Sequence, residues 1–377
     1  MMKRSILAVF SAAAVAAAAS SCNQKKADPV LVSSTVEITL GNPATKVFGD
    51  GSTEAFEKGV SSITVFVYEN NDETCILQRT FTEFEIEQGK AVFAIPDVKA
   101  QTLYDFFAIA NCNLSGLGEK PTRTSLLAET EGTGASSSTY GSLSDYNGVF
   151  NSVTTSALRN VNGQTGFIMS GMATAMTPAA GSNIPTKVTV PLRRTVAKVA
   201  IDMKVTTTFQ DKYTSRSTLK ITNAQLKQLV KSTSLIVPKS EPSTLGTVDG
   251  ELTQSPFVVT ENKQYQNLFY IYANGVEQHP SAENERPILV LTALFDFDGD
   301  GSTTEDQSTI TYNIKLSGEA GNETDTSDND FGLFKRNGNY KVNIDINGLT
   351  ENEVVAEIEI KDWETVKQQD ITIGDKN

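Results

Sequence analysis

Alternating carboxylates form the most concentrated chemical group in this sequence. They are Asp296, Asp298 and Asp300, separated by Phe297 and Gly299 and followed by Gly301. An EF-hand loop presents oxygen ligands to Ca²⁺ at this spacing, with glycine at the sixth position. The twelfth position is Gln307 instead of a bidentate glutamate, although Glu305 and Asp306 lie close. Because Asp and Gly also suit a hairpin turn, the pattern predicts either an acidic hairpin tip or a Ca²⁺ site, and the turn is the simpler explanation.

Residues for nucleophilic catalysis are scarce. The chain has one histidine, His279, in a polar stretch, and it has no Gly-x-Ser-x-Gly sequence. A Ser-His or Cys-His pair would have to use His279. That histidine, Cys75 and Cys112 do not have the spacing of a zinc site. Carboxylates are abundant, but nothing selects a pair for glycoside hydrolysis. We therefore predict a protein that is not an enzyme and has no cofactor apart from the candidate Ca²⁺.

The first residues carry an export signal that ends at a cysteine. Lys3 and Arg4 precede the uncharged residues 5–19, and small residues then run directly into Cys22. This order is typical of a signal peptide and not of a structural helix. The small residues before Cys22 resemble a bacterial lipobox, so we predict lipidation of Cys22. A diacylglycerol and an N-acyl chain such as palmitate would hold the precursor stably at a membrane.

A strand pattern followed by a basic residue comes next. Val36–Leu40 alternates in the manner of a β-strand, and Lys46-Val47 follows it. A trypsin-like protease could cut between Lys46 and Val47. Such a cut would release everything before it, including Cys22 and the strand.

The two other cysteines lie in or beside strand-like runs. Cys75 follows Ile63–Tyr68, and Cys112 follows Phe106–Ala110. An exported protein could pair them, but two buried free thiols are at least as good an explanation as a disulfide.

Length and composition exclude several classes of protein. The chain has 377 residues, is 39% hydrophobic and has a formal charge of −13. The length predicts about two domains. The negative charge repels phosphate backbones, so we expect no nucleic-acid partner. After residue 21 no apolar run reaches the roughly 18 residues that a spanning helix needs.

Short strands with turn residues between them dominate the rest of the chain. In the first half they are Ser62–Tyr68, Ala91–Pro96 and Tyr104–Asn111, and in the second half Lys187–Val205, Asn267–Tyr272, Ile288–Phe297, Ser308–Leu316, Asn339–Ile346 and Glu353–Lys361. Leu219–Ile221 and Gln225–Leu229 are two shorter elements. Thr124–Thr130 is the best helix candidate, and residues 131–152 read as a surface loop. This pattern predicts an all-β protein with one β-sandwich in each half and a boundary near residue 186.

An ordered set of short motifs resembles a known family. The motifs are Val36–Leu40, Lys46-Val47-Phe48-Gly49, Ser61–Tyr68, Pro191-Leu192-Arg193-Arg194 leading into Ala197-Lys198-Val199, Phe334–Val342 and Asp362-Trp363. Together they are similar to the major fimbrillins of Gram-negative anaerobes, the subunits of type V pili. The resemblance spans most of the chain in order.

The resemblance implies a fold and a route of assembly. It implies two transthyretin-like β-sandwich domains, export as a lipoprotein, and cleavage after a basic residue by a processing protease. Loss of the first strand would open a groove that a C-terminal strand of a neighbouring subunit fills. The predicted segments are a signal peptide at 1–21, a propeptide with the first strand at 22–46, an N-terminal sandwich at 47–186 and a C-terminal sandwich at 187–377.

One position departs from the family. The family usually has arginine where this chain has Lys46, and no arginine lies between residues 5 and 78. Either a lysine-tolerant enzyme cuts here or the subunit is not processed. Cuts at Lys25 or Lys26 would leave the strand in place.

These observations lead to the hypothesis of a fimbrial subunit at the cell surface. The predicted donor residues are Val354, Ala356, Ile358, Ile360, Ile371 and Ile373, because alternation can present apolar side chains to one groove. The predicted partners are other fimbrial subunits at anchor and tip positions, the protease, and a host or bacterial surface receptor. The strand-like end of the chain favours a stalk subunit over a tip subunit. The alternative is a monomeric surface lipoprotein that binds glycan or a receptor.

Overall fold

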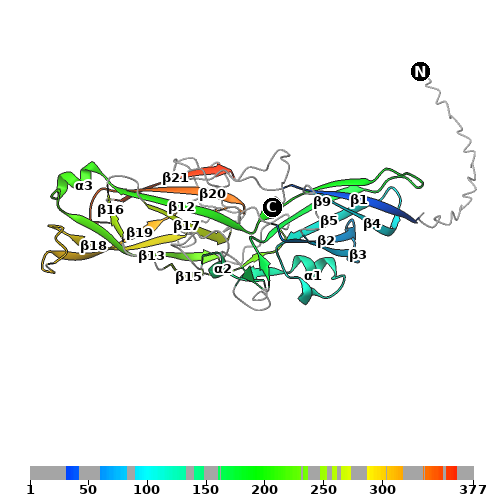
Figure 1. The fold of residues 1–377 in the computed structure, drawn as a ribbon, viewed down its shortest axis with the longest axis horizontal. Helices are drawn as coiled ribbons and strands as arrows, with labels where there is room; N and C mark the ends of the chain where they lie inside the picture. Colours follow the sequence, from blue (N-terminus) through cyan, green and yellow to red (C-terminus); the bar gives the residue numbers. More distant parts are fainter. Residues whose placement is uncertain are drawn as a thin grey trace, which may run out of the picture.

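The structure is a computed structural model. It describes residues 31–41, 60–82, 90–132, 140–147, 160–161, 163–230, 232–236, 247–252, 257–260, 265–272, 287–302, 304–316, 334, 336–350 and 354–362. The predictions for the signal peptide, Cys22, Lys46, Val47, His279, Ile371 and Ile373 lie outside these residues. Figure 1 shows an elongated molecule with the first strands at one end and the last strands towards the other.

Two sheets that share one core form the first half. A three-stranded sheet has the order β10-β1-β4, and a five-stranded sheet has the order β11-β9-β5-β2-β3. The strands are β1 Leu31–Gly41, β2 Ser62–Glu69, β3 Cys75–Thr82, β4 Lys90–Lys99, β5 Leu103–Ala110, β9 Met169–Met176, β10 Thr186–Pro191 and β11 Arg193–Arg194. Val36, Phe93 and Val188 of the smaller sheet pack in one cluster with side chains such as Val65 and Phe106 of the larger sheet. This arrangement is a β-sandwich.

The other face of the five-stranded sheet is also covered. Phe66, Tyr68, Phe107 and Ile109 point to that face and pack with Leu126. Leu126 belongs to the short helix α1 (Arg123–Leu127), which follows the 3₁₀ turn η2 (Ser115–Leu117). Burial on both faces explains why β2 and β5 are almost continuously apolar instead of alternating.

A second pair of sheets forms the other sandwich. The sheet orders are β17-β12-β20-β21 and β15-β13-β18-β19, with β16 paired to β13. The elements are β12 Val196–Val205, α3 Thr207–Lys212, β13 Thr218–Val230, β15 Thr247–Leu252, β16 Phe257–Val259, β17 Tyr265–Tyr272, β18 Ile288–Asp296, β19 Gln307–Lys315, β20 Gly338–Ile346 and β21 Val354–Asp362. Inward side chains of both sheets, such as Val199 and Leu291, belong to one cluster. The predicted all-β architecture is therefore confirmed.

Short elements join the two sandwiches. β6 (Thr130–Gly132) of the first half pairs with β14 (Ser232–Ser234) of the second. The remaining described elements are α2 Leu143–Asn147, β7 Asn160–Val161 and β8 Gln164–Thr165. No helix in the described part of the chain is both long and apolar enough to cross a membrane.

Three local predictions need correction. β10 and β11 pair with strands of the first sandwich, so the sheets divide near Thr195 and not near residue 186. The predicted loop at residues 131–152 contains α2, and Tyr146 of that helix is fully buried. The two predicted elements at 219–229 are the single strand β13, whose register shifts twice against its neighbours. Such bulges interrupt the alternation of a strand without ending it.

The predicted helix lies close to its expected place. α1 spans Arg123–Leu127, and the Thr122 side chain caps it by accepting a hydrogen bond from the Ser125 N–H. The helix is therefore shorter than the predicted Thr124–Thr130 and begins one residue earlier.

Candidate functional site

Strand β1 lies in the middle of the smaller sheet of the first sandwich. It pairs in parallel with β10, where Val36 lies opposite Thr186, and antiparallel with β4, where Val36 lies opposite Phe93. The Val36 side chain is 1% exposed and belongs to the core of the sandwich. The predicted strand Val36–Leu40 is thus part of a longer strand with a hydrogen-bonded neighbour on each side.

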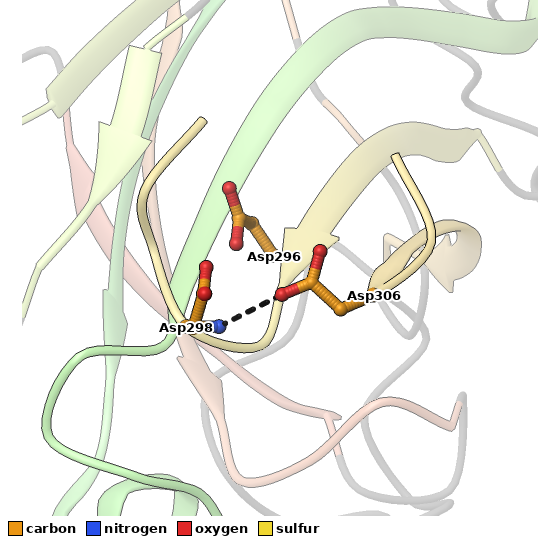
Figure 2. Close-up of side chains that lie close together, drawn as sticks. All are labelled: Asp296, Asp298 and Asp306. Carbon is orange, nitrogen blue, oxygen red and sulfur yellow. Dashed lines mark hydrogen bonds between the residues drawn. The ribbon is translucent and has the colours of Figure 1, made fainter. Parts of the chain in front are cut away.

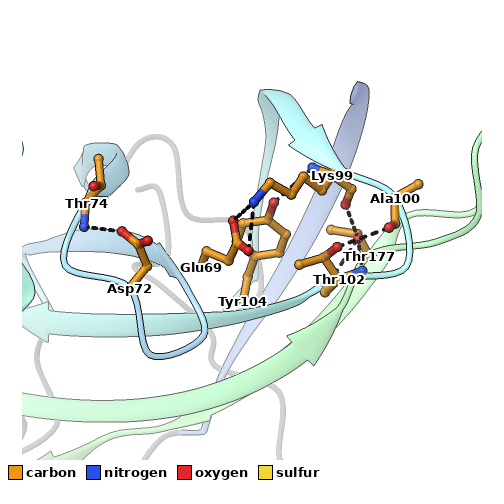
Figure 3. Close-up of polar contacts among 8 residues, drawn as sticks. All are labelled: Glu69, Asp72, Thr74, Lys99, Ala100, Thr102, Tyr104 and Thr177. Carbon is orange, nitrogen blue, oxygen red and sulfur yellow. Dashed lines mark hydrogen bonds and ion pairs between the residues drawn. The ribbon is translucent and has the colours of Figure 1, made fainter. Parts of the chain in front are cut away.

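The end of β4 beside the start of β1 is fastened to the opposite sheet. The Lys99 ammonium group donates hydrogen bonds to both carboxylate oxygens of Glu69 on β2, at 2.9 and 2.7 Å. The Lys99 carbonyl accepts the Thr177 hydroxyl at 2.6 Å, and the Lys99 N–H donates to the Tyr104 hydroxyl at 2.9 Å. Figure 3 shows these contacts around one residue. The hydrogen bond to Glu69 raises the pKa of Lys99, so this lysine stays charged. None of these contacts involves β1.

The other neighbour, β10, is also held by the opposite sheet. Val188 and Val190 of β10 are buried in the core. The Pro191 carbonyl, at the end of β10, lies against Gly171 of β9 so closely that a β-carbon there would be 2.1 Å from its oxygen. The glycine is therefore required for the close approach of the two backbones. Both neighbours of β1 thus have attachments of their own.

Strand β21 is the described part of the predicted donor region. It pairs antiparallel with β20, from Val354 opposite Ile346 to Asp362 opposite Gly338. It is the last strand in the order of its sheet, so only one of its edges is paired within the described residues. The predicted positions Val354, Ala356, Ile358 and Ile360 all lie on this strand.

The acidic turn joins β18 to β19. Carboxylate oxygens of Asp296, Asp298 and Asp306 lie within 4.8 Å of one another (Figure 2). The predicted Asp300 is not part of this group, because its carboxylate accepts the N–H and hydroxyl of Ser302 at 2.7 Å each. The third carboxylate of the group is thus Asp306 and not the predicted Asp300. Asp306 follows the turn, and closure of the hairpin brings it close to Asp296 and Asp298.

Hydrogen bonds within the chain account for much of this turn. The buried Asp296 carboxylate accepts the N–H groups of Gly299 at 2.7 Å and Gly301 at 3.0 Å. For Asp298, the hydrogen bond from the Asp300 N–H lowers the pKa, but desolvation and the charges of Asp300 and Asp306 raise it, and the net pKa is raised. Repulsion between carboxylates is the kind of effect that a bound cation would relieve.

Cys75 and Cys112 are both buried and free. Cys75 lies opposite Tyr68 at one end of β2, and Cys112 follows Ala110, which lies opposite Ile63 at the other end. At ~3.3 Å per strand residue the two cysteines are far beyond the ~7 Å that a disulfide spans. Of the two alternatives, the structure supports free thiols.

The sequence matches a known protein family over most of its length. The sequence pattern of the fimbrillin-A associated anchor proteins Mfa1 and Mfa2 matches residues 29–369, a range that includes both β1 and β21. The chain belongs to this family. The predicted relationship to fimbrillins is therefore confirmed, and a fimbrial role at the cell surface follows from it at the level of the family.

Solved structures share the fold of this fimbrillin-associated chain. The fimbrilin FimA from Porphyromonas gingivalis W83 aligns with a TM-score of 0.56 and 15% identity, covering 89% of this chain and 98% of that chain. The tip fimbrial protein Mfa3 from Porphyromonas gingivalis, with a C-terminal truncation, aligns with a TM-score of 0.51 and 16% identity, covering 88% of this chain and 100% of that chain. A comparison with curated protein sequences found no match.

A hydrogen bond that the sequence did not predict joins two of the family-like motifs. Arg194, from the Pro191–Arg194 motif, donates to the Asn337 side chain at 2.8 Å, and Asn337 lies in the Phe334–Val342 motif. Arg194 is fully buried where the two sandwiches join. Sequence reasoning also missed Lys99, Thr177 and Gly171, whose roles depend on contacts between sheets. Among these residues, only Arg194 had a local signal in the sequence, because it follows another arginine directly before a strand.

Proposed function

We propose that this chain is a structural subunit of a surface fimbria that polymerises by donor-strand exchange. In this proposal a protease cuts between Lys46 and Val47, and the released segment includes β1. A C-terminal strand of a neighbouring subunit then takes the place of β1. The role is structural and not catalytic, and the partners are other fimbrial subunits. The matched family is named for anchor proteins, and a tip fimbrial protein shares the fold.

The position of β1 is the observation that carries the proposal. Because β1 lies between β10 and β4, its removal would leave unpaired N–H and C=O groups on both neighbours and uncover apolar core side chains such as Phe93. An open edge of this kind is a template for strand addition. An incoming strand would restore two ladders at once.

The attachments of β4 and β10 support a slot that persists after the cut. The Lys99–Glu69 ion pair and the Thr177 hydrogen bond would hold β4, and the Gly171–Pro191 contact would hold β10. A slot held open in advance costs the incoming strand less ordering free energy than one that must re-form.

The donor in this proposal comes from the segment that begins at β21. Its alternating residues Val354, Ala356, Ile358 and Ile360, with Ile371 and Ile373 further on, would fill the positions that β1 leaves. Because donor and slot lie on different sandwiches, the contact is head-to-tail and generates a filament instead of a closed dimer. The lipid on Cys22 would hold the precursor in the outer membrane until the cut.

Limited proteolysis tests this function. The full precursor without its signal peptide is treated with trypsin, and the products are separated by gel electrophoresis without boiling. We expect a ladder of SDS-resistant oligomers from the native chain and from Lys46→Arg, and none from Lys46→Ala. Lys26→Ala is the matched control and should still give the ladder, since a cut there leaves β1 in place.

Two results would contradict the proposal. A native chain that is cut after Lys46 and stays monomeric would support the alternative of a monomeric surface lipoprotein. An unchanged ladder from Lys46→Ala would show that this bond does not control assembly.

A further inference from the structure

We propose that the free end of the first sandwich is a lipid-facing surface, which rests against the membrane while Cys22 carries its lipid. This end, called the distal tip, consists of Leu31 at the start of β1, the turn at 100–103 and the segment 176–185. The proposal rests on the lipid attachment in the proposed function and adds a surface that the attachment alone does not require.

Exposed apolar side chains gather at the distal tip. Six large hydrophobic residues in the described part of the chain are exposed, and four belong to the tip: Leu31 at 57%, Leu103 at 42%, Met176 at 57% and Ile184 at 71%. Leu103 lies directly opposite Met176 in the β5–β9 pair, and Leu31 lies opposite Lys99 in the β1–β4 pair. The other two, Val258 and Phe297, belong to the second sandwich. Single exposed apolar residues are ordinary, but a gathering marks an interaction site.

The tip is also uncharged in a strongly acidic chain. Residues 100–103 and 176–185 contain no charged residue, although the whole chain has a formal charge of −13. The adjoining Lys99 is paired with Glu69 at 2.7 Å. Asp72, on the neighbouring β2–β3 turn, accepts the Thr74 N–H, which lowers its pKa and keeps it ionised (Figure 3). A neutral apolar surface with an acidic neighbour fits zwitterionic lipid better than anionic lipid.

Hydrogen bonds hold the tip in one shape. The Gln101 N–H donates to the Pro178 carbonyl at 3.2 Å, and the Thr177 N–H donates to the Thr102 carbonyl at 2.9 Å. The Ser182 N–H donates to the Ala179 carbonyl and the Ser182 hydroxyl accepts the Ile184 N–H, which fixes the turn beneath Ile184. The apolar side chains are therefore presented by a rigid support, and their burial in lipid would cost little ordering free energy.

The predicted lipid attachment point brings the tip within reach of the membrane. Leu31 is the ninth residue after Cys22. A fully extended segment of that length spans at most ~30 Å. The molecule is elongated, and β1 begins at the end that carries the tip (Figure 1). Attachment through Cys22 therefore keeps the tip close to the bilayer. Transfer of the exposed apolar side chains of the tip from water to the headgroup–acyl boundary is favourable.

Tryptophan quenching on lipid vesicles tests the proposal. The chain from residue 22 is coupled through Cys22 to a maleimide lipid in phosphatidylcholine vesicles, and Cys75 and Cys112 do not compete because both are buried. Trp363, the single tryptophan, is replaced by phenylalanine. One variant then carries Ile184→Trp in the tip, and the matched control carries Phe297→Trp at an exposed apolar position of the second sandwich. Brominated phosphatidylcholine quenches only a tryptophan that enters the bilayer.

We expect brominated lipid to quench the tryptophan at position 184 and to leave the one at 297 unchanged. Adding Leu103→Ser and Met176→Ser should reduce the quenching at 184, and circular dichroism would confirm that each variant is folded. Equal quenching at both positions, or none at 184, would overturn the proposal. A second copy of the chain, without lipid, is then added. If the quenching at 184 disappears only after this addition, the tip contacts protein instead of lipid.

This result is separable from the proposed function. The lipid is attached chemically, so the quenching does not depend on processing in cells or on polymerisation. Mass spectrometry of Cys22 in protein from cell membranes tests the natural lipid attachment by itself.

Discussion

Asp105 is the buried carboxylate that attaches the α1 cover to the five-stranded sheet. It lies on β5 and accepts hydrogen bonds from Thr174 at 2.6 Å, Asn70 at 3.1 Å and Arg123 of α1 at 2.5 Å. The Asp105 side chain is 2% exposed and the Arg123 side chain is 18% exposed. Burial raises the pKa of Asp105, but the hydrogen bonds from its three donors lower the pKa by a larger amount. The net pKa of Asp105 therefore lies below the ordinary value.

Replacement of Asp105 by asparagine should lower the free energy of unfolding by about 2–4 kcal/mol, because it leaves the Arg123 guanidinium without its counter-charge. Urea denaturation at neutral pH measures this. Asp72→Asn, in an exposed turn, is the control and should change stability far less. Equal losses in the two variants would show that the Asp105–Arg123 pair adds nothing.

The Asp105 contribution should also depend on pH. Because the folded-state pKa is lowered, the contribution is fully present above the unfolded pKa of about 4 and is lost as the pH falls through the folded value. The difference in unfolding free energy between the native chain and Asp105→Asn should therefore shrink in acid. A difference that stays constant down to about pH 2 would contradict this assignment.

The acidic turn should bind Ca²⁺ weakly, with a dissociation constant on the order of millimolar, since its ligand set is smaller than that of a complete EF-hand loop. Isothermal titration calorimetry measures the affinity. Asp298→Asn should abolish the heat and Asp300→Asn should preserve it, because Asp300 bonds to Ser302 and lies outside the carboxylate group. Micromolar affinity would show that further ligands complete the site.

At the scale of elements, the contact between β9 and β10 leaves no room for a side chain at Gly171. Gly171→Ala would place its methyl carbon 2.1 Å from the Pro191 carbonyl oxygen. Residues 171 and 191 both belong to strands that are held in sheets, β9 and β10. We expect a loss of roughly 1–3 kcal/mol of unfolding free energy, which is typical of overpacking. Thermal and urea unfolding would measure it.

Gly116→Ala is the matched control for this substitution. No atom lies within 4 Å of a β-carbon built at Gly116, in the 3₁₀ turn η2. Stability should therefore stay nearly unchanged. A harmless Gly171→Ala would mean that β10 can move away from β9, which would weaken the case for a slot held open without β1.

At the scale of the whole molecule, Arg336 connects the sandwiches through an intermediate segment. Arg336 precedes β20 and donates to the Thr233 hydroxyl at 2.7 Å and to the carbonyls of Ser234 and Leu235. The same segment, β14, pairs with β6 of the first sandwich. Beside it, the carboxylate of the buried Glu131 accepts the hydroxyls of Tyr146 at 2.5 Å and Thr195 at 2.8 Å. The junction is thus a buried polar network that couples the two cores.

Arg336→Lys should weaken this coupling, because lysine keeps the charge but cannot reproduce the planar fork of donors. We expect the unfolding of the two sandwiches to separate in calorimetry, with a loss of about 1–3 kcal/mol in the less stable one. Arg216→Lys, at an exposed arginine, should leave a single transition. A single transition at an unchanged temperature in Arg336→Lys would show that the junction does not depend on this residue.

Local chemistry in the sequence determined most of the strands and the all-β class. Strand patterns such as Ser62–Tyr68 and Ile288–Phe297 match β2 and β18 within about a residue, because β-branched and aromatic runs bounded by turn residues are a short-range signal. Other short-range signals, the Asp and Gly spacing and the residues that flank a helix, identified the acidic turn and the helix α1. Bulges in β13 hid its continuity, since they break the alternation on which the prediction depends.

Only the tertiary structure decided how these strands combine. The parallel pairing of β1 with β10 joins residues about 150 positions apart, and no local pattern encodes it. The division of the sheets near Thr195 likewise follows from pairing between distant strands. The entry of Asp306 into the carboxylate group follows from closure of the β18–β19 hairpin, and the separation of Cys75 from Cys112 follows from the pairing of β2 with β3 and β5. Register is set by the packing of whole faces against a shared core, so it becomes visible only when both sheets are in place.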